Sequence, residues 1–408
     1  MTNPSLQSEG SKRISFDQIA ENIREPGQPT IDDSTTYIGL EHLDSGTLSI
    51  HRSGSKTDLK GQKLKMRKGD ILFAKRNAYL RRVAIAPYNG FFSAHGMVIR
   101  AKPDVVLPEL LPFFMMSEVF MSRAEKISVG SLSPTINWTT LKKEVFVIPP
   151  INDQQKIASL LWAAEDYMAK NERFIEEAER AKQVLAQDLF GSLNNAPSGN
   201  TKQIRFKSLK TSNYVKIGEI CDVKGGLQKT QTRSPKSNPV RYLTVIHVQR
   251  NHIDFNEPRY FEVTQKELDE LRLLAGDVLI VEGNGNKNEV GRSAIFRGEL
   301  EDCVHQNHII RIRPNPNQLN SEFLNFYLNS TFGQNDILKR SMSTSGLYTL
   351  SVGRVKNLII PYPSLSKQQQ IASVLNHCDV TIANGRMNLA ATRVLKMKLI
   401  NQFFTDEG

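Results

Sequence analysis

The chain contains the same glutamine-rich motif twice. DQQKIASLL occupies residues 153–161, and KQQQIASVL occupies residues 367–375, 214 residues later. Two copies so far apart indicate a duplicated module of domain size, because solenoid repeats recur at about 20–50 residues. We therefore expect two related halves, each with its own copy of the motif.

Shorter similarities upstream of the motif extend the duplication over most of the chain. They pair residues 37–46 with 242–251, 66–77 with 273–284, and 146–153 with 358–367. Ahead of the motif, each copy holds short β-branched runs broken by Gly, Pro and Asn, which is typical of strands. After it, each copy continues without proline and with apolar residues at helical spacing. The predicted fold class is α+β, with a strand-rich domain and one long helix in each half.

Each helical tail carries a heptad pattern, in which apolar residues recur in alternating steps of four and three. Such a pattern is typical of a coiled-coil seam. At about 40 residues, each helix would be about 60 Å long, more than its own domain can cover. The predicted pairing residues are Ile157, Leu161, Met168, Ile175, Leu185 and Leu189 in the first tail, and Ile371, Leu375, Ile382, Leu389, Leu399 and Phe403 in the second.

Charge favours pairing of the two tails with each other. Residues 151–190 carry five basic and eight acidic side chains, whereas residues 365–404 carry five basic and one acidic. Oppositely charged flanks favour pairing between unlike helices. An antiparallel pair would separate the two strand-rich domains in a pseudo-two-fold arrangement. The alternative is that each helix lies only on its own domain.

These patterns divide the chain into five predicted segments. The sequence GSLNNAPSGNTK at 191–202 has the small, polar composition of a linker. The segments are a first strand-rich domain at 1–150, a central helix at 151–190, the linker at 191–202, a second strand-rich domain at 203–363 and a C-terminal helix at 364–408.

Composition narrows the class of partner. Of 408 residues, 53 are Lys or Arg and 42 are Asp or Glu, which gives a net charge of +11. This excess favours an anionic partner, with nucleic acid as the first candidate. The opening residues lack the apolar core of a signal peptide, and no apolar run approaches the ~18 residues of a membrane span. A cytoplasmic protein without membrane contact is expected.

The basic excess concentrates in two segments of the strand-rich domains. Residues 56–82 include ten cations and two carboxylates, and residues 202–250 include eleven cations and two carboxylates. Loops 74–82 and 282–292 follow equivalent Gly-Asp strands and are rich in Arg and Asn, which hydrogen-bond to base edges. The alternatives are a solvated face and ordinary turn formation. The predicted DNA-contacting residues are Lys63, Lys65, Lys68, Lys75, Arg76, Asn77, Arg81, Arg82, Lys224, Lys229, Arg233, Asn284, Asn286, Lys287, Asn288, Arg292, Gln306 and His308.

Metal binding by the cysteines is not expected. Cys221, Cys303 and Cys378 are scattered and odd in number, so they form neither a disulfide framework nor a four-cysteine zinc site. His305 and His308 lie near Cys303, but no fourth ligand follows at a useful spacing. We predict no metal ligand in this chain.

Two other segments resemble catalytic motifs without matching them. GNGNKN at 283–288 has the glycines of a phosphate loop, but it fits neither GxxxxGK[ST] nor GxGxxG ahead of a helix. Asp277, Glu282 and Lys287 resemble a metal-dependent nuclease set, yet Glu282 and Lys287 are too far apart in sequence. The chain also lacks the Pro-Pro-aromatic motif of amino-methyltransferases. No catalytic residue is predicted, and the chain is expected to bind without catalysing.

Two strand-rich halves, each closed by an Ile-Pro turn and a QQxIAxxL helix that ends in Leu-Phe or Phe-Phe, resemble the specificity subunit of type I restriction-modification systems. The resemblance covers nearly the whole chain, with residues 153–190 and 367–404 matching the conserved helices of that family. It implies two target-recognition domains that each read one half of a split DNA sequence. Those domains vary within the family, so base-contacting residues are not carried over.

The resemblance also implies partners and cofactors. Double-stranded DNA would be the ligand of this chain, and two modification (methyltransferase) subunits would dock on the conserved helices and methylate adenine. A restriction translocase subunit would join some complexes. S-adenosylmethionine, ATP and Mg would bind to those partner subunits. The alternative is a two-domain DNA-binding repressor or scaffold that recruits no enzyme.

Overall fold

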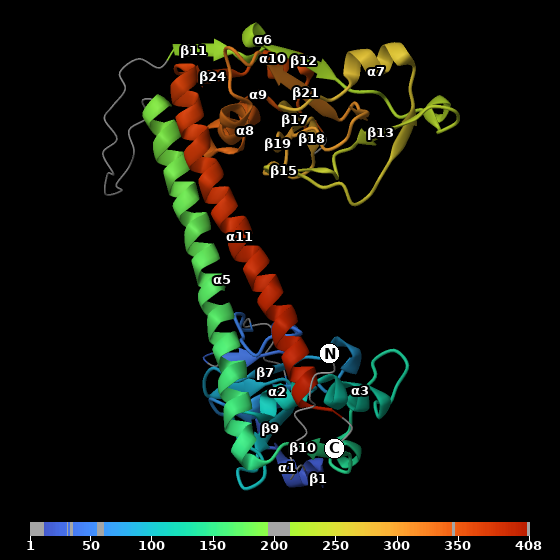
Figure 1. Ribbon diagram of the computed structural model, residues 1–408, viewed down its shortest axis with the longest axis vertical. Helices are drawn as coiled ribbons and strands as arrows, with labels where there is room; N and C mark the ends of the chain where they lie inside the picture. Colours follow the sequence, from blue (N-terminus) through green and yellow to red (C-terminus); the bar gives the residue numbers. More distant parts are fainter. Residues whose placement is uncertain are drawn as a thin grey trace, which may run out of the picture. The chain divides into compact units, whose positions relative to one another are not determined.

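The computed structural model describes residues 12–30, 32, 36–54, 61–194, 213–344 and 347–405. Its contacts divide the chain into two units. Unit 1 comprises residues 1–175 and 384–408, and unit 2 comprises residues 176–383. Each unit combines a strand-rich domain with part of two long helices, α5 (Ile151–Asn194) and α11 (Leu365–Phe403), which lie beside each other (Figure 1).

Unit 1 is built on two four-stranded sheets. The first has the order β2 (Ala20–Ile23), β9 (Met97–Ala101), β6 (Ile71–Phe73), β7 (Val83–Ile85), and all its pairs are antiparallel. The second has the order β3 (Pro26–Gly27), β5 (Lys63–Met66), β8 (Gly90–Phe92), β4 (Tyr37–Ile38), and its β4–β8 pair is parallel. A separate pair joins β1 (Lys12–Ser15) to β10 (Val145–Ile148).

Unit 2 repeats the strand order of the first sheet, whereas its second sheet has three strands instead of four. Its main sheet has the order β12 (Cys221–Gly225), β21 (Ile309–Pro314), β17 (Asp277–Val281), β19 (Ser293–Phe296), again all antiparallel. A second sheet, β16 (Tyr260–Glu262), β13 (Pro239–Leu243), β20 (Cys303–His305), contains a parallel pair, as in unit 1. Smaller groups are β11 (Asn213–Lys216) with β24 (Ile359–Tyr362), β14 (Val248–Gln249) with β15 (His252–Ile253), and β18 (Gly283–Asn284) with β23 (Leu347–Thr349) and β22 (Met342–Thr344).

Short helices also recur in equivalent places. The pair α2 (Leu111–Met116) and α3 (Glu118–Lys126) in unit 1 corresponds to α8 (Ser321–Asn329) and α9 (Thr331–Arg340) in unit 2. The hydroxyls of Ser117 and Ser330 cap α3 and α9 by accepting a hydrogen bond from the backbone N–H of Phe120 and Gly333. The remaining short helices are α1 (Phe16–Ile19), α4 (Trp138–Leu141), α6 (Ile217–Ile220), α7 (Gln265–Leu271) and α10 (Val352–Lys356).

The repeated glutamine motif attaches each long helix to its own domain. Gln154 is buried; its amide donates to the carbonyls of Val105 and Pro149 and accepts from the N–H of Leu107 at 2.8 Å. Gln368 makes the same set of bonds in unit 2, to the carbonyls of Gln318 and Pro363 and from the N–H of Asn320 at 2.9 Å. A buried amide that satisfies three backbone groups requires this residue, and both copies therefore keep it.

Both long helices insert apolar residues into the domain cores. In unit 1 an aromatic cluster of Phe16, Phe114, Phe120 and Phe146 packs with Ile157, Leu161, Ile400 and Phe404. In unit 2, Phe190, Phe323 and Tyr327 pack with Leu189, Ile371 and Leu375. Each long helix thus contributes side chains to both cores, so the alternative in which each helix lies only on its own domain is wrong.

The helices also pair with each other within each unit, and the pairing is antiparallel. In unit 1, Met168 and Ile175 are buried, and the Asn171 amide donates to the carbonyl of Gly385 at 2.9 Å. In unit 2, Ile382 is buried and Lys182 forms an ion pair with Asp379. Pairing and docking on the domains therefore both occur.

The seam differs from its predicted residues in two respects. Leu185, Leu389, Leu399 and Phe403 are only half-buried, and Leu185, Leu399 and Phe403 pack against the domain cores. At the end of α11 the fully buried residues are Ile400 and Phe404, each one position later than predicted. An α-helix has 3.6 residues per turn and drifts from a strict heptad, so the buried stripe moves once the helix meets the core of unit 1.

The predicted linker starts too early. Helix α5 continues to Asn194 instead of ending at residue 190, and the rest of the predicted linker, 195–202, lies outside the described residues. Among the residues that the structure describes, no helix combines the length and hydropathy needed to cross a membrane.

Candidate nucleic-acid interface

The Gly-Asp turns that precede both predicted loops are held by ion pairs in which the carboxylate is buried. Asp70 accepts two hydrogen bonds from the Arg100 guanidinium, at 2.6 and 2.9 Å, and Asp277 accepts two from Arg313, at 2.7 and 2.8 Å. Each carboxylate also accepts from a backbone N–H of its own turn. Bidentate pairs of this kind fix geometry. They position the loops that follow β6 and β17, and they occupy the Asp277 carboxylate that a nuclease site would need.

A cluster of cations in unit 1 combines residues from both of its four-stranded sheets. Lys63 lies on β5, Lys75 and Arg76 follow β6, His95 lies between β8 and β9, and Arg24 follows β2. We call these five residues the basic cluster. Burial, followed by the charges of Arg76, Lys75 and Lys63, lowers the pKa of His95. Burial and the charge of Arg24 lower the pKa of Lys75.

The basic cluster has no ion pair with a carboxylate among the residues that the structure describes. Lys63 instead lies over the ring of Tyr37, with its ammonium 4.9 Å from the ring centroid. Uncompensated like charges at one place raise the energy of the free protein and favour a bound anion.

A hollow of about 420 Å³ opens beside the basic cluster. Its lining combines Arg24 and Lys75 with the amides of Asn22 and Asn137 and the indole of Trp138. Cations fit phosphates, amides fit base edges, and an indole offers an apolar or stacking face, so this lining suits a nucleic acid. Sequence reasoning missed Arg24, Asn22, Asn137, His95 and Trp138, because only the fold brings these distant positions to Lys75.

Two predicted arginines of unit 1 serve the domain itself. Arg81 forms ion pairs with Glu118 and Glu125 on α3, and these bonds raise its pKa. Arg82 is half-buried and donates to the carbonyl of Leu40 at 2.7 Å. Both guanidiniums are therefore engaged within unit 1, and a role for either one in binding DNA stays a prediction that this geometry does not favour.

The other predicted residues of unit 1 differ in exposure. Lys65, Lys68 and Arg76 are exposed. Asn77 is half-buried, has a φ of 56°, and its Oδ1 is buried without a hydrogen-bond partner among the described residues. Contact with a base by Asn77 would therefore need its amide to turn outward.

In unit 2 the predicted asparagines stabilise their own turn. Asn284 Oδ1 accepts from the N–H of Asn286 at 2.9 Å, and Asn286 Oδ1 accepts from the N–H of Asn288 at 3.0 Å. Bonds of this type are the usual reason for Asn in loops. Lys287, at the same turn, is exposed. Base contact by these side chains stays a prediction, and their turn-forming role is a structural fact.

Two predicted arginines of unit 2 are also engaged internally. Arg233 pairs with Glu267 at 2.6 Å, and this contact, with the Thr264 backbone, lowers the pKa of Glu267 to about 2. Arg292 donates to the carbonyls of Val245 and Val248 at 2.6 and 2.7 Å. These guanidiniums hold loops of unit 2 in place. Lys229 and His308 are exposed, whereas Lys224 and Gln306 are half-buried.

The Cys and His residues near β20 do not form a zinc site. Burial raises the pKa of the Cys303 thiol to about 12 and lowers the pKa of His305 to about 3, so both belong to the core. His308 points to Glu282 instead, at 3.3 Å. Within the described ranges, no group of three or more His, Cys, Asp or Glu residues has the arrangement of a metal site.

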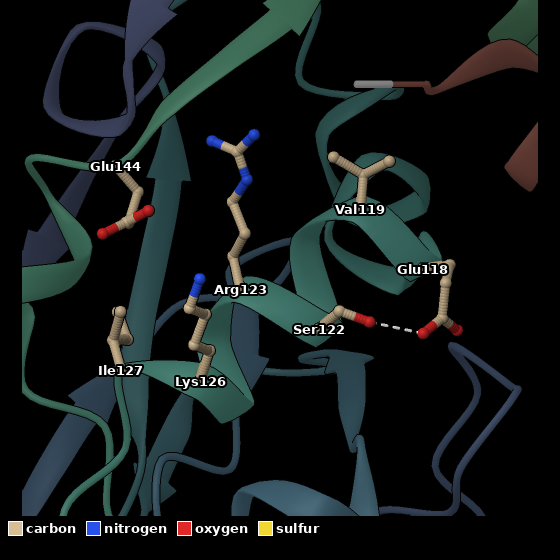
Figure 2. Close-up of a pocket in the computed structure, with 7 residues that line it drawn as sticks. All are labelled: Glu118, Val119, Ser122, Arg123, Lys126, Ile127 and Glu144. Atoms are coloured by element: carbon tan, nitrogen blue, oxygen red, sulfur yellow. Dashed lines mark hydrogen bonds between the residues drawn. The ribbon is translucent and has the colours of Figure 1, made fainter. Parts of the chain in front are cut away.

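A second hollow in unit 1, of about 650 Å³, lies along α3 (Figure 2). Arg123 and Lys126 project from α3 into the same space, and Glu118 and Glu144 also line it. Arg123 is held by the carbonyl of Val145 and lies 5.1 Å from the centroid of the Phe146 ring. Two carboxylates balance two cations here, so this hollow does not favour an anion as the basic cluster does.

Comparison with known proteins identifies the family. The model of the family described as the type I restriction modification DNA specificity domain matches residues 30–180 and 210–390. The chain belongs to this family. The two matched segments coincide with the two copies of the duplication, and the resemblance inferred from the sequence is confirmed.

Several curated members of the specificity-domain family are similar over part of their length. The type I restriction enzyme EcoKI specificity subunit of Escherichia coli strain K12 is 23% identical over 292 residues, which are 70% of this chain and 61% of that subunit. The putative MjaX specificity subunit of Methanocaldococcus jannaschii is 27% identical over 188 residues, 45% of this chain and 43% of that subunit. The alignments thus span less than two thirds of either relative.

Solved structures confirm the fold. The type I restriction-modification S subunit from M. genitalium superposes with a TM-score of 0.60 at 17% identity, over all of both chains. A chain solved for complex assembly and conformational transition of the type I R-M system gives the same TM-score at 20% identity, covering 98% of this chain and 99% of its own. The predicted α+β class with strand-rich domains and long helices is confirmed.

Proposed function

We infer that this chain is the DNA sequence-recognition subunit of a type I restriction-modification complex. The observation that carries this proposal is the basic cluster beside an amide-lined and indole-lined hollow, in a chain of this family. Phosphate contacts by the cations would supply affinity and register, and amides in the hollow would read base edges.

Each unit would read one half of a bipartite target. The main sheets of units 1 and 2 have the same strand order but carry different loops, so the two units present different side chains from equivalent positions. In unit 1 the basic cluster, with its exposed Arg76, is the proposed contact region. In unit 2 the proposed contacts are Lys224, Lys229, Lys287, Gln306 and His308, with the turn of Asn284, Asn286 and Asn288 shaping the loop.

Catalysis would belong to partner subunits. Two methyltransferase subunits would bind S-adenosylmethionine and methylate adenine, and a translocase subunit with ATP and Mg would perform restriction. In this chain, Asp277 is paired with Arg313, and Cys303 and His305 are buried in the core of unit 2. Residue types that suit nuclease chemistry or zinc binding thus have structural roles, which supports a non-catalytic function for the chain.

A stripe on α5 offers a docking surface for the methyltransferase. Leu160, Tyr167 and Phe174 recur every seven residues and remain about half exposed, at 47%, 49% and 48%. On α11, Met387 and Val394 also recur at seven and are exposed at 69% and 57%. In helix pairs, side chains of one helix insert between heptad-spaced side chains of the other. An exposed apolar stripe with this spacing therefore suits the binding of a further helix. These stripes support docking of partner helices on the pair.

Mapping of methylated adenines tests the proposal. The chain would be co-expressed with a methyltransferase subunit of a type I system from the same organism, in a host without other adenine methylation. We expect methylation at one bipartite sequence, and none when this chain is omitted. Exchange of residues 12–150 for the same domain of a relative should change one half-site only. Methylation that ignores such an exchange would contradict the proposal.

The docking stripe has its own test. Changing Leu160, Tyr167 and Phe174 together to Ser should abolish co-purification with the methyltransferase while the isolated chain still binds DNA. These positions lie outside the core clusters, so the variant should lose only helix propensity, less than about 0.7 kcal/mol per position. If the triple variant still co-purifies in full yield, docking occurs elsewhere. A chain that binds DNA but never co-purifies with a methyltransferase would instead fit a repressor.

A further inference from the structure

Two loops of unit 1 are joined into a single projection. The segment 75–81 contains a 3-10 turn, η4 (Ala78–Leu80), and runs beside residues 128–135. The N–H of Ile136 donates to the carbonyl of Lys75 at 2.9 Å, and the N–H of Ala78 donates to the carbonyl of Pro134 at 3.3 Å. Arg76 and Thr135 form a β-bridge. The two loops therefore move as one body.

The projection ends in apolar side chains that face solvent. Tyr79, Leu80, Val129 and Leu132 are exposed to 58%, 38%, 67% and 94%. We call these four residues the apolar tip. Single exposed apolar residues are common on protein surfaces, but a group of four on adjoining loops marks an interaction site.

The apolar tip has a rigid support. Asn77 and Arg81, at the two ends of η4, both adopt the left-handed conformation, with φ of 56° and 48°. Such strain persists only where surrounding contacts hold it. The ion pairs of Arg81 with Glu118 and Glu125 and the burial of Ala78 supply those contacts. Arg81 is therefore a positioning residue for this projection.

Cations adjoin the apolar tip in the same loop. Lys75 and the exposed Arg76 precede Tyr79, and both belong to the basic cluster. A polyanion seated on that cluster would meet the tip as well. Charge complementarity therefore selects duplex DNA as the occupant.

We propose that the apolar tip is a wedge that enters the duplex at a base step of the half-site bound by unit 1, partly unstacks it and bends the DNA. This inference rests on the proposed function and adds a mode of recognition to it. Architectural proteins insert Leu, Phe or Met in this way and bend the duplex by about 20–90°. The unstacking selects flexible base steps, so the tip would contribute specificity without hydrogen bonds.

Rigidity separates a wedge from simple contact with thymine methyl groups. Methyl contact needs one apolar side chain at a base edge and tolerates a mobile loop. Unstacking a base step costs free energy, and a mobile loop would yield before the duplex does. The projection is held by backbone hydrogen bonds between its two loops and by the ion pairs of Arg81. It therefore has the rigidity that unstacking requires.

The test measures DNA bending by the full-length chain. A duplex with the mapped target would carry a donor and an acceptor dye at its ends. We expect energy transfer to rise when the parent binds, and to rise much less with the variant Tyr79→Ser/Leu132→Ser. A single mismatch placed at the contacted step should tighten binding of the parent about tenfold, because it lowers the cost of unstacking, and should leave the variant unchanged.

A control variant changes a Tyr and a Leu of the other unit. Tyr260→Ser/Leu274→Ser replaces side chains of unit 2 that are exposed to 44% and 47%, and this variant should bend DNA like the parent. Equal unfolding midpoints would show that both double variants fold. Equal bending by the tip variant and the parent would overturn the wedge, and so would a parent that binds its target without bending it. Failure of the parent to prefer its mapped target would instead overturn the proposed function, and the wedge with it.

Discussion

The ammonium group of Lys396 on α11 forms a buried ion pair with the carboxylate of Glu165 on α5, within unit 1. Its Nζ also donates to the carbonyl of Gly46 at 2.9 Å. In unit 2, Lys182 on α5 pairs with Asp379 on α11. Lys182 and Lys396 are equivalent positions of the duplication, as are Glu165 and Asp379, each 214 residues apart. The duplication thus places the same kind of ion pair in each unit, with the lysine on α11 in unit 1 and on α5 in unit 2.

Removing one partner of the buried pair should destabilise the chain strongly. Lys396→Met leaves Glu165 buried without a cation, which costs about 3–5 kcal/mol, whereas Lys396→Met/Glu165→Met should recover most of that loss. The exposed pair Arg393–Glu172 is the control, and Arg393→Met should cost about 0–1 kcal/mol. Urea unfolding measures all three variants. Equal losses for the single and double variants would contradict a coupled ion pair.

Gly385 allows the helices of unit 1 to approach closely. A Cβ at this position would lie 2.9 Å from Cγ1 of Ile175. Gly385→Ala gains about 1 kcal/mol of helix propensity, but overpacking costs about 1–3 kcal/mol, so a net loss of stability is expected. Gly353 in α10 has its nearest neighbour at 4.0 Å, and Gly353→Ala should be neutral or stabilising. A stabilised Gly385→Ala variant would show that the two helices can separate at this point without loss.

The salt dependence of DNA binding should locate the phosphate contacts. Changing Lys63, Lys75 and Arg76 together to Ala should weaken binding to every sequence and reduce the slope of log K against log salt by about 0.9 for each phosphate no longer neutralised. Arg297→Ala should leave that slope unchanged, because Arg297 lies outside the basic cluster and already pairs with Glu322 at 2.6 Å. Fluorescence anisotropy at several salt concentrations provides both slopes. An equal reduction of the slope for Arg297→Ala would show that the slope does not report contacts of the basic cluster.

DNA affinity should increase as the pH falls. In the free chain, burial and the neighbouring cations hold the pKa of His95 below its usual 6.5. A phosphate bound at the basic cluster would raise that pKa, so binding takes up a proton, and affinity rises as pH falls between the bound and free pKa values. Titrations from about pH 8 to about pH 5.5 would show the rise. His95→Gln should flatten the profile, and an equal rise in that variant would assign the effect to another group.

The duplication, the strand-rich halves and the long helices could be predicted from the sequence, since they depend on local pattern. Heptad spacing appears directly in the order of residues, and it located Ile157, Leu161, Met168, Ile175, Ile371, Leu375 and Ile382 among the buried positions. The glutamine motif was visible too, although its role was not. Only the fold shows that Gln154 and Gln368 bond to loops of their own domains.

The candidate interface depended on the tertiary structure. A basic segment in the sequence shows how many cations are present, but not which of them face carboxylates. Folding brings Glu118 and Glu125 to Arg81 and Glu267 to Arg233, and it brings Arg24 and His95 to Lys75. Charge and desolvation act through space over a few ångströms, whereas these partners are separated by tens of residues in the chain. The sequence therefore determined the architecture, and the tertiary structure decided which of its charges are free to bind.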